Sequence, residues 1–451
     1  MEWRNARSGR CRGVPMPEGR TAENGGPLHA TRPNPTSSGL TSMATGGGSQ
    51  SFRETLRLFL ESVCCDLCRF EHVATEHIAP EDVVIRQEVA VGPSAFADIQ
   101  VTPRGTAPYF VEVDYGYTPE RLIESLRRKY GEPNEATAAA SKVVLVIDVN
   151  GRKGWPGLEA RARSVLRPGL ALEVWDERRL DELVRRRFGV SLGSLEEHDR
   201  LELRAAVDRA KGRHAFGDDF SADPLESTLL WHFGFWRLRQ LREAGRKTAR
   251  DILPPGLYPN VVVVTADLSG YTRFVRDTRD DDVVRRSLTA FASRTRYQII
   301  NAGGMLYQFL GDSVIAIFGI PEAAPDDAER GFACATALID IGASVAIEWQ
   351  RQIDQIQPST GVHVAMATGD LQVIEFRPFS RTHVGVVGDA INLAARLCGV
   401  AQTHEIVVSN SLYSRLTDRT RDGFLAMEPV EAKNLGSVRA WKLAPRAGPR
   451  S

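Results

Sequence analysis

Between residues 52 and 189, short apolar runs alternate with stretches whose apolar residues recur at helical spacing. Runs rich in β-branched and aromatic residues are predicted to be strands: 83–91, 97–103, 108–115, 142–149 and 171–176. The stretch 120–131, closed by Gly131, has the periodicity of an amphipathic helix, and so does the stretch around Leu60. Alternating strands and helices favour a layered α/β sheet, so this segment is predicted to form a domain of its own.

Two more helices are predicted before the pattern changes again. Residues 195–212 are amphipathic, and residues 223–245 open with Asp223 as N-cap and Pro224 at the first helical position. The apolar stripe of the second helix consists of Leu225, Leu229, Phe233 and Trp236. We interpret this helix as a connector packed on a core, and the alternative is a helix that binds a partner. The segment ILPPGLYP at 252–259 ends it and marks a domain boundary.

The next segment places two carboxylates at predicted strand ends. Residues 260–274 form a β-branched run that ends in Asp267, and a Ser-Gly turn leads into a helix whose free amides favour anionic phosphates. In 303–319, two apolar runs meet at a Gly-Asp pair that ends in Asp312, which indicates a hairpin. If the hairpin pairs beside the first strand, the two aspartates converge and can bind two divalent ions. Each aspartate alone would be a turn former or a cap.

A third element lies at 382–409. A Gly-Asp pair ends an apolar strand, and the helix that follows carries Asn392 and Arg396 four residues apart, hence on one face. The residues around them are apolar. A lone pair of this kind is usually solvated, but an amide and a guanidinium on an otherwise apolar helix favour a functional role.

The composition bounds the class of protein. The chain has 451 residues, 25% charged and 42% hydrophobic, so it is long enough for two or three domains and is not disordered overall. Lys plus Arg and Asp plus Glu number 57 each, so no whole-chain charge favours nucleic acid or an acidic membrane. No apolar run approaches the ~18 residues of a membrane span, and the N-terminus lacks the apolar core of a secretory signal. We therefore expect a cytoplasmic protein.

Residues 1–50 are rich in Gly, Pro, Ser and Arg and are predicted to be a disordered tail. The sequence leaves open whether the natural chain begins at Met1 or at Met43. Six cysteines in so long a chain indicate reduced thiols. One stretch offers possible zinc ligands, namely Cys64, Cys65, Cys68, His72 and His77. Their spacing is too compressed for a zinc finger, so we predict a helix with buried thiols.

Four segments resemble motifs of the class III nucleotidyl cyclase catalytic domain, over about residues 260–443: ADLSGYT, YQFLGDSVIAIFG, PEAAPDDAERG and VGDAINLAARL. The resemblance implies a ferredoxin-like βαββαβ core. It also implies that Asp267 and Asp312 bind two divalent ions, Mn²⁺ or Mg²⁺, that Asn392 orients the ribose, and that Arg396 stabilises charge on the phosphates. The reaction would convert a nucleoside triphosphate into a 3′,5′-cyclic nucleotide and pyrophosphate.

In this family the metal-binding pair and the Asn/Arg helix come from different subunits. With one such domain in the chain, the resemblance implies a symmetric homodimer with two shared sites. The expected partners are therefore a nucleoside triphosphate and a second copy of the chain, and indirectly an effector protein that reads the cyclic nucleotide. No membrane partner is expected, and nucleic acid is not an expected partner of this function.

The positions that select the base depart from the family pattern. Gln308 stands where adenine-specific members have Lys and guanine-specific members have Glu, and Gly385 stands where adenine-specific members have Asp or Thr. Tyr271 replaces the usual Phe. This looks like the pyrimidine cyclases of bacterial anti-phage signalling, so we rank UTP first, CTP second and ATP third. The alternative is that Tyr271 only fills the core and Gln308 is neutral.

The N-terminal segment has an acidic array of its own. ADIQV places Asp98 on a predicted strand, and FVEVD places Glu112 and Asp114 on one face of the next. The array resembles the restriction-endonuclease-like fold, whose metal site uses an Asp and a Glu-x-Lys. Asp114 occupies the Lys position, so we predict a sensor or interaction domain rather than an active nuclease.

The predicted fold class is α+β, with a cyclase domain at 257–446 preceded by an α/β restriction-endonuclease-like domain at 51–190 and a helical connector at 191–256. Two functions of different class remain. One is an enzyme that makes a cyclic nucleotide signal under the control of its N-terminal domain. The other is a nucleic-acid-binding or nuclease module with a cyclase-like dimerisation domain. The presence of Asp267, Asp312, Asn392 and Arg396 together favours the enzyme.

Overall fold

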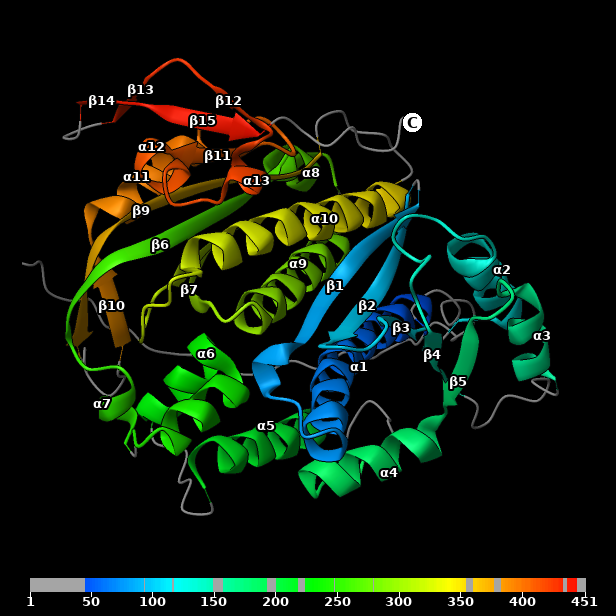
Figure 1. Ribbon diagram of the computed structural model, residues 1–451. Helices are drawn as coiled ribbons and strands as arrows, with labels where there is room; N and C mark the ends of the chain where they lie inside the picture. Colours follow the sequence, from blue (N-terminus) through cyan, green and yellow to red (C-terminus); the bar gives the residue numbers. More distant parts are fainter. Residues whose placement is uncertain are drawn as a thin grey trace, which may run out of the picture. The chain divides into compact units, whose positions relative to one another are not determined.

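Two separate β-sheets organise the chain (Figure 1). The computed structural model describes residues 45–92, 94–115, 117–148, 157–192, 200–217, 224–246, 248–278, 280–353, 360–376, 383–432 and 436–443. Residues 46–451 form one compact unit. One sheet lies in the predicted range 51–190 and the other almost wholly in 257–446, and the division into separate domains stays a prediction.

The first sheet has five strands in sequential order, β1-β2-β3-β4-β5. Its strands are β1 (Val83–Gly92), β2 (Ala95–Pro103), β3 (Tyr109–Val113), β4 (Lys142–Val146) and β5 (Ala171–Trp175), and a short 3₁₀ turn, Pro80–Asp82, precedes them. The β1-β2-β3 pairs are antiparallel, and the β3-β4-β5 pairs are parallel. The strand predictions are therefore confirmed. The parallel strands are buried because helices cover both faces of this part of the sheet.

The helices of the first sheet are α1 (Thr45–Thr75), α2 (Pro119–Tyr130), α3 (Leu158–Val165) and α4 (Glu177–Phe188). α2 and α3 cover one face, where Leu122 and Ala162 pack with Phe110 and Leu145. α1 and α4 belong to the core of the other face. α1 begins at Thr45, whereas the disordered tail was predicted to extend to residue 50. Residues 1–44, with Met43, lie outside the described residues.

The connector consists of α5 (Arg200–Phe216), α6 (Pro224–Glu243) and α7 (Ala249–Ile252). All four residues of the predicted apolar stripe of α6 are buried, which confirms a helix packed on a core. α6 is not one regular helix, because Gly234 has φ 70° and ψ 163° and kinks it. That conformation favours glycine. Asp223, the predicted N-cap, and residues 195–199 lie outside the described residues.

The second sheet has the order β12-β15-β11-β9-β6-β8-β7, and β10 pairs with β9. Its central strands are β6 (Gly256–Ser269), β7 (Met305–Leu310), β8 (Ser313–Phe318), β9 (Gly361–Phe376), β10 (His383–Val387) and β11 (Ile406–Ser409). The remaining strands are β12 (Phe424–Ala426), β15 (Ala440–Leu443) and the separate pair β13 (Val430–Ala432) and β14 (Gly436–Val438). The order β9-β6-β8-β7 is that of the predicted βαββαβ core.

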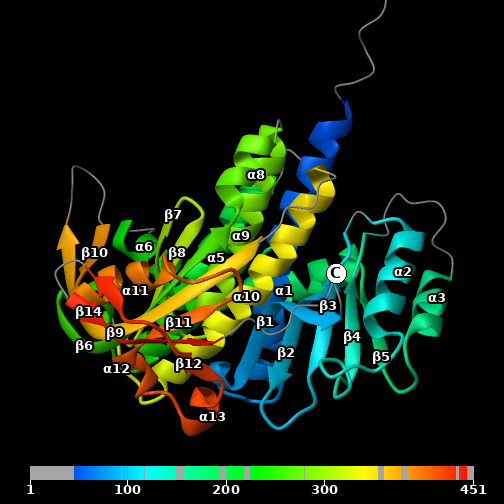
Figure 2. The same ribbon diagram turned by 90° about the horizontal axis from the view of Figure 1, so that it is seen from above.

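The helices of the second sheet are α8 (Tyr271–Asp277), α9 (Asp281–Asn301), α10 (Asp327–Ile353), α11 (Asp389–Cys398), α12 (Asn410–Tyr413) and α13 (Asp418–Arg421). α9 and α10 bury the face of β6 that carries Val262 and Val264. Figures 1 and 2 show these two helices between β6 and strand β1 of the first sheet. The opposite face of β6 and α11 belong to an apolar core shared with α1, α5 and α6.

α10 bears on the expectation that no stretch can span a membrane. Among the described helices it alone, over Asp327–Arg351, is long and apolar enough to do so by length and composition, which is weak evidence for a membrane span. Its apolar residues Ile341, Val345 and Trp349 are buried in the core of the second sheet. A buried core helix of this length and composition meets the same criteria as a membrane-spanning helix.

Candidate active site

Asp267 lies at the end of the central strand β6, between two other strands. Its neighbours in register are Ser313 on β8 and His363 on β9. The Ser313 hydroxyl donates a hydrogen bond to Oδ1 of Asp267, and Nε2 of His363 lies 3.5 Å from Oδ2. The Asp267 side chain is 31% exposed, so it can meet a ligand from solvent.

Asp312 lies in the tight turn that joins β7 to β8. Gly311, before it, has φ 66°, a value that favours glycine in such a turn. The backbone amide of Leu268 donates to the carbonyl of Asp312 at 3.4 Å, which holds the turn against the end of β6. Burial and then the charge of Asp267 raise the pKa of Asp312. The structure therefore brings the two predicted metal-binding carboxylates together.

This carboxylate pair fits divalent ions that prefer oxygen ligands. Burial first and then the charge of Asp267 raise the pKa of Asp312; a cation would offset the like charges of the pair, and both carboxylates remain partly exposed. Cyclases of class III generally use two divalent ions, Mg²⁺ or Mn²⁺. Asp267 and Asp312 are the residues that would hold them.

His363 is a site residue that the sequence did not reveal. Its Nδ1 lies 2.7 Å from the hydroxyl of Ser269, which follows Asp267 by two residues. Burial lowers the pKa of His363, although the charges of Asp267 and Asp312 act in the opposite direction. No motif or spacing links His363 to Asp267, and only the register of β6 and β9 places the two side by side.

The helix α11 carries Asn392 and Arg396, both exposed. The buried residues of α11 are Ala390, Ala394, Leu397 and Cys398. The thiol of Cys398 contacts the carbonyl of Thr265 at 3.7 Å, so the buried side of α11 faces β6. The helix is amphipathic, since its apolar residues Ala394 and Leu397 are buried whereas Ala395 is exposed beside the pair.

Asn392 and Arg396 therefore point away from the strand that carries Asp267 in the same chain. At 100° per residue they lie on the side of α11 opposite Ala394. Within the described part of the chain, neither side chain has a hydrogen-bond or ion-pair partner. The structure brings the two aspartates together, but it does not bring this pair to them.

The three predicted base-reading residues occupy different environments. The Tyr271 ring packs against Phe274 and Trp349, and its hydroxyl donates to the carbonyl of Val284 at 3.3 Å. Burial and the charge of Asp312 raise the pKa of Tyr271 to about 12. This placement agrees with a core role, and its role as a base reader stays a prediction.

Gln308 lies on β7 and Gly385 lies on β10, two strands that contact each other through side-chain hydrogen bonds. Gln308 is exposed on β7, directly after a bulge, and Gly385 is buried on β10 opposite Ile374. The Tyr307 hydroxyl donates to the carbonyl of Val386 and accepts from its amide, both at 3.2 Å. This contact joins β7 to β10 one residue away from each predicted reader.

The acidic array of the first sheet is buried and carries its own cations. Asp98 accepts a hydrogen bond from the amide of Val113 at 2.7 Å, and Glu112 binds both the ammonium of Lys129 and the hydroxyl of Tyr130. Lys129 lies on α2, so a cation is present although Asp114 occupies the expected strand position. Spacing along β3 could not reveal it, because the lysine comes from another element.

A second acidic group adjoins this array. Carboxylate oxygens of Glu61, Glu88 and Asp98 lie within 4.8 Å of one another, a spacing that could hold a metal ion. Arg294 of α9 is instead placed there, 2.7 Å from Glu88 and 3.4 Å from Glu61, and its side chain is 0% exposed. The guanidinium therefore supplies the positive charge of this cluster, which is distinct from the pair Asp267 and Asp312.

The cysteines of α1 confirm the prediction of buried thiols. Cys64, Cys65 and Cys68 are free and buried, and burial raises the pKa of the Cys68 thiol to about 12. A thiol in that state is a poor zinc ligand.

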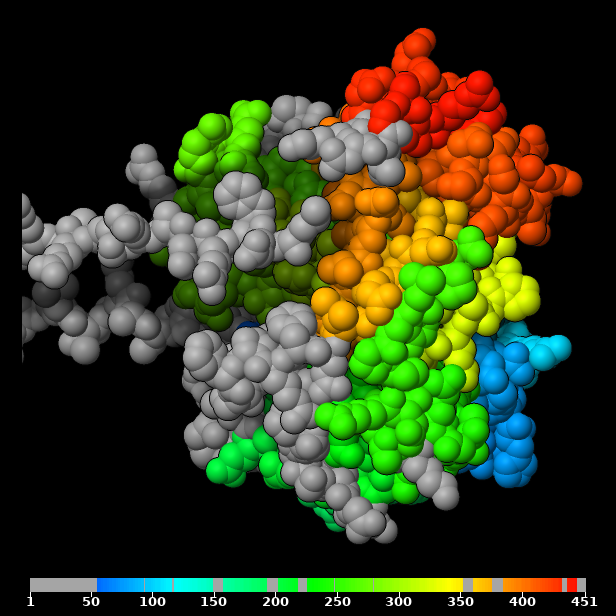
Figure 3. Space-filling view, turned by 90° about the vertical axis from the view of Figure 1, so that its left-hand side faces the viewer, coloured from blue at the N-terminus to red at the C-terminus, as the bar shows by residue number. Residues whose placement is uncertain are grey.

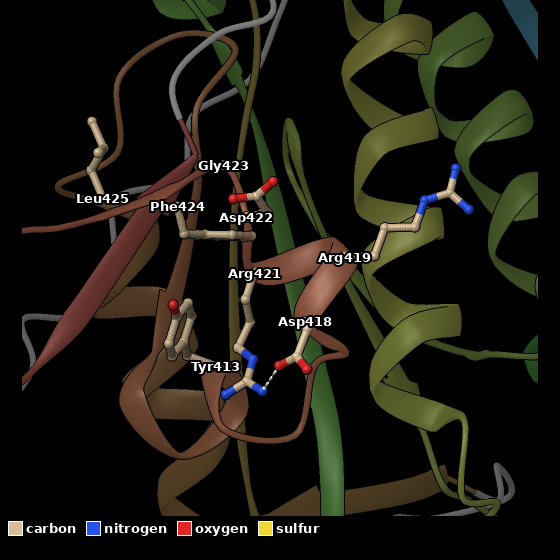
Figure 4. A pocket seen from close by; sticks show the side chains of 8 residues that line it. All are labelled: Tyr413, Asp418, Arg419, Arg421, Asp422, Gly423, Phe424 and Leu425. Carbon is tan, nitrogen blue, oxygen red and sulfur yellow. Dashed lines mark hydrogen bonds and ion pairs between the residues drawn. The ribbon is translucent and has the colours of Figure 1, made fainter.

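One surface hollow of about 840 Å³ lies apart from these sites (Figure 4). Its lining includes Tyr413, Arg421 and Phe424, and none of the predicted site residues. Tyr413 stacks on Trp441 with ring centres 4.0 Å apart, and Arg421 pairs with Asp418, so these side chains are engaged with one another.

Comparison with known proteins identifies the second sheet and its helices. Residues 253–443 match the family model of the adenylate and guanylate cyclase catalytic domain. This region is therefore a class III nucleotidyl cyclase catalytic domain.

Individual relatives agree with the family match. An adenylate cyclase of Mycobacterium tuberculosis is 27% identical over 201 residues, which are 42% of this chain and 40% of that protein. An uncharacterized protein of Mycobacterium bovis is 28% identical over 145 residues, 32% of this chain and 25% of the relative. The chain thus spans between a quarter and two fifths of the length of these curated relatives.

Solved structures of cyclases are also similar to this chain. The crystal structure of the guanylyl cyclase Cya2 is 25% identical, with a TM-score of 0.38, and the match covers 44% of this chain and 98% of Cya2. The adenylyl cyclase CyaB from P. aeruginosa is 20% identical, with a TM-score of 0.37, over 44% of this chain and all of CyaB.

Proposed function

We propose that the protein is a nucleotide cyclase that converts a nucleoside triphosphate into a 3′,5′-cyclic nucleotide and pyrophosphate at sites shared by two copies of the chain. One observation carries this proposal. Asp267 and Asp312 meet at the end of β6, whereas Asn392 and Arg396 project from the opposite, exposed side of α11. A catalytic site that uses all four residues needs a second chain.

The residues present suit the chemistry of cyclisation. The ribose 3′-oxygen forms a bond to the α-phosphorus, the bond from that phosphorus to the bridging oxygen breaks, and pyrophosphate leaves while the hydroxyl proton passes to solvent. Arg396 stabilises the negative charge that spreads over the phosphates, and Asn392 orients the ribose. Asp267 and Asp312 would hold divalent ions, which would lower the pKa of the hydroxyl and neutralise phosphate charge.

An apolar patch supports a contact between chains. Leu257 of β6 is 63% exposed and Val387 of β10 is 52% exposed, and both lie beside Gln372 of β9 in register. Ile374, two residues along β9, is also exposed. Figure 3 shows the start of β6 in green beside the orange segments of β9 to α11 on this face. Exposed apolar patches of this kind favour association.

The shared site is tested by complementation. Asp312→Ala and Arg396→Ala chains are each expected to be inactive, because every site in either homodimer lacks one group. Mixed, they form heterodimers in which one of the two sites is intact, so activity should return. A mixture that stays inactive while heterodimers are seen by native mass spectrometry would contradict the shared site.

For the base, the proposal is UTP first, CTP second and ATP third. The exposed amide of Gln308 supports it, since an amide can both donate to and accept from a pyrimidine edge. The packing of Tyr271 supports the alternative, in which that residue only fills the core. Incubation with each of four nucleoside triphosphates and Mn²⁺, followed by mass spectrometry of the product, decides the order. We also propose a role in anti-phage signalling through an effector protein, and a cytoplasmic location.

A second candidate function is cleavage of nucleic acid by the first sheet. The contact between Lys129 and Glu112, with Asp98 on the neighbouring strand, favours it over the sensor role expected from Asp114 alone. The burial of all three side chains favours the sensor role. Metal-dependent cleavage of DNA or RNA that Lys129→Met abolishes would support the nuclease.

A further inference from the structure

Both carboxylate oxygens of Asp267 have a neighbour supplied by the sheet. The Ser313 hydroxyl donates to Oδ1, and Nε2 of His363 lies 3.5 Å from Oδ2. These two residues flank Asp267 on the adjacent strands β8 and β9. The orientation of the carboxylate is thus determined from both sides of the central strand.

The imidazole of His363 is itself held in place. Its Nδ1 lies 2.7 Å from the hydroxyl of Ser269, a distance typical of a hydrogen bond. A neutral imidazole has one N–H and one acceptor nitrogen. For Nε2 to donate toward Asp267, Nδ1 accepts from the serine hydroxyl. A serine hydroxyl can donate or accept, so the acceptor-only carboxylate of Asp267 favours this tautomer and Ser269 holds the ring in place.

The chain also links this contact to the turn after the strand. Ser269 ends β6, and Gly270 with φ 77° reverses the chain into α8. His363 therefore ties two points of the same strand end, the carboxylate of Asp267 and the residue that begins the turn. The imidazole is largely buried, with 16% of its side chain exposed, so solvent competes little for these contacts.

We propose that His363 is a positioning residue of the cyclase site, which holds Asp267 in the orientation that binds a divalent ion and couples it to the Ser269 turn. The inference rests on the proposed function. Groups that orient a metal ligand from behind typically change metal affinity about 10- to 100-fold when they are removed.

The test compares His363→Leu, which removes both nitrogens, with His363→Gln, whose amide can still donate toward Asp267. Binding of Mn²⁺ is measured by electron paramagnetic resonance of the free ion, with and without a nucleoside triphosphate. The expected result is an Mn²⁺ half-saturation raised about tenfold or more in His363→Leu and returned to within a few-fold of the parent in His363→Gln. His404→Leu is the matched control, since His404 does not contact Asp267 in the described part of the chain and its substitution should leave Mn²⁺ affinity unchanged.

Two outcomes separate this inference from the proposed function. If the parent chain neither binds Mn²⁺ nor forms a cyclic nucleotide, the proposed function fails. If the parent chain does both and His363→Leu binds Mn²⁺ equally well, only the role of His363 fails. Should His363→Leu not fold, as judged by circular dichroism, Ser269→Ala provides the test, because it removes the hydroxyl that holds the imidazole in place and should weaken Mn²⁺ binding several-fold. Unchanged binding in Ser269→Ala would then overturn the inference.

Discussion

The two carboxylate clusters of this chain differ in where their positive charge comes from. In the second sheet, Asp267 and Asp312 lie together at a partly exposed strand end, and among the described residues no Lys or Arg pairs with either. In the first sheet, Lys129 and Arg294 are built in among the buried carboxylates of Glu112, Glu88 and their neighbours.

This difference follows from the cost of burying charge. A carboxylate removed from water needs a charged partner, so a fully buried cluster folds with its cations in place. The partly exposed pair can stay hydrated until an ion from solution binds. The comparison teaches that a set of acidic residues indicates a metal site only where the protein has not already supplied the cation. The following three predictions test this difference between the two carboxylate clusters.

The largest effect is expected for Asp312→Asn. Loss of one metal-binding carboxylate should lower cyclase activity about a thousandfold, about 4 kcal/mol in activation free energy. The stability of the fold should not fall, because the substitution also removes the repulsion by Asp267 that contributes to the raised pKa of Asp312. Steady-state kinetics and thermal unfolding measure the two quantities. Asp418→Asn, an exposed carboxylate on α13, is the control and should change neither.

The opposite pattern is expected for Arg294→Met in the buried cluster. Removing the guanidinium leaves Glu88 buried without its cation and Glu61 with Arg57 alone, which should destabilise the chain by about 3 kcal/mol. Urea unfolding measures the loss. Arg285→Met on the same helix removes an exposed guanidinium that pairs with Asp282 and should cost less than about 1 kcal/mol. Equal stabilities of the two variants would show that Arg294 does not compensate the cluster.

The smallest effect is a pH dependence of stability from Asp114. Burial, together with the charge of Asp98, raises the pKa of Asp114 to about 6 from its usual 3.8, and its Oδ2 has no hydrogen-bond partner among the described residues. The folded chain therefore binds this proton more tightly than the unfolded chain. The resulting stability is complete below pH 3.8 and is lost as the pH rises through 6, by at most about 1.4 kcal/mol per pH unit.

Urea unfolding at several pH values between 4.5 and 7.5 measures this slope. Asp114→Asn, which cannot titrate, should flatten the slope relative to the parent chain. Asp251→Asn is the control of opposite sign, because hydrogen bonds from Thr248 lower the pKa of Asp251, so its contribution is lost as the pH falls. A parent and an Asp114→Asn chain with the same slope would place the titration elsewhere.

Local patterns in the sequence were sufficient to predict the helices and strands and the proximity of Asp267 and Asp312. The β-branched run before Asp267 and the Gly-Asp turn at Asp312 each encode their own conformation, and pairing of two adjacent strands brings them together. The exposed face of Asn392 and Arg396 likewise follows from helical periodicity. The kink of α6 at Gly234 was not predicted, because a glycine within an apolar stripe gives no indication of a positive φ.

The residues that the sequence did not reveal act across elements. The position of His363 beside Asp267 depends on the register of β9 against β6. Lys129 on α2 contacts Glu112 on β3, and Arg294 on α9 contacts carboxylates of α1 and β1. Single-sequence spacing contains no information on such long-range pairings. The base readers remain predictions for the same reason, since in the proposed shared site their neighbours would come from another chain.

The two-sided arrangement of α11 has a consequence for gene dosage. In the proposed symmetric pair, each cleft takes its acidic residues from one copy and its arginine from the other. A copy with a damaged acidic residue spoils one cleft of a mixed pair and leaves the other working. The total cyclase activity in a cell with intact and damaged copies should therefore decline linearly with the damaged fraction. Such an allele would not be dominant negative.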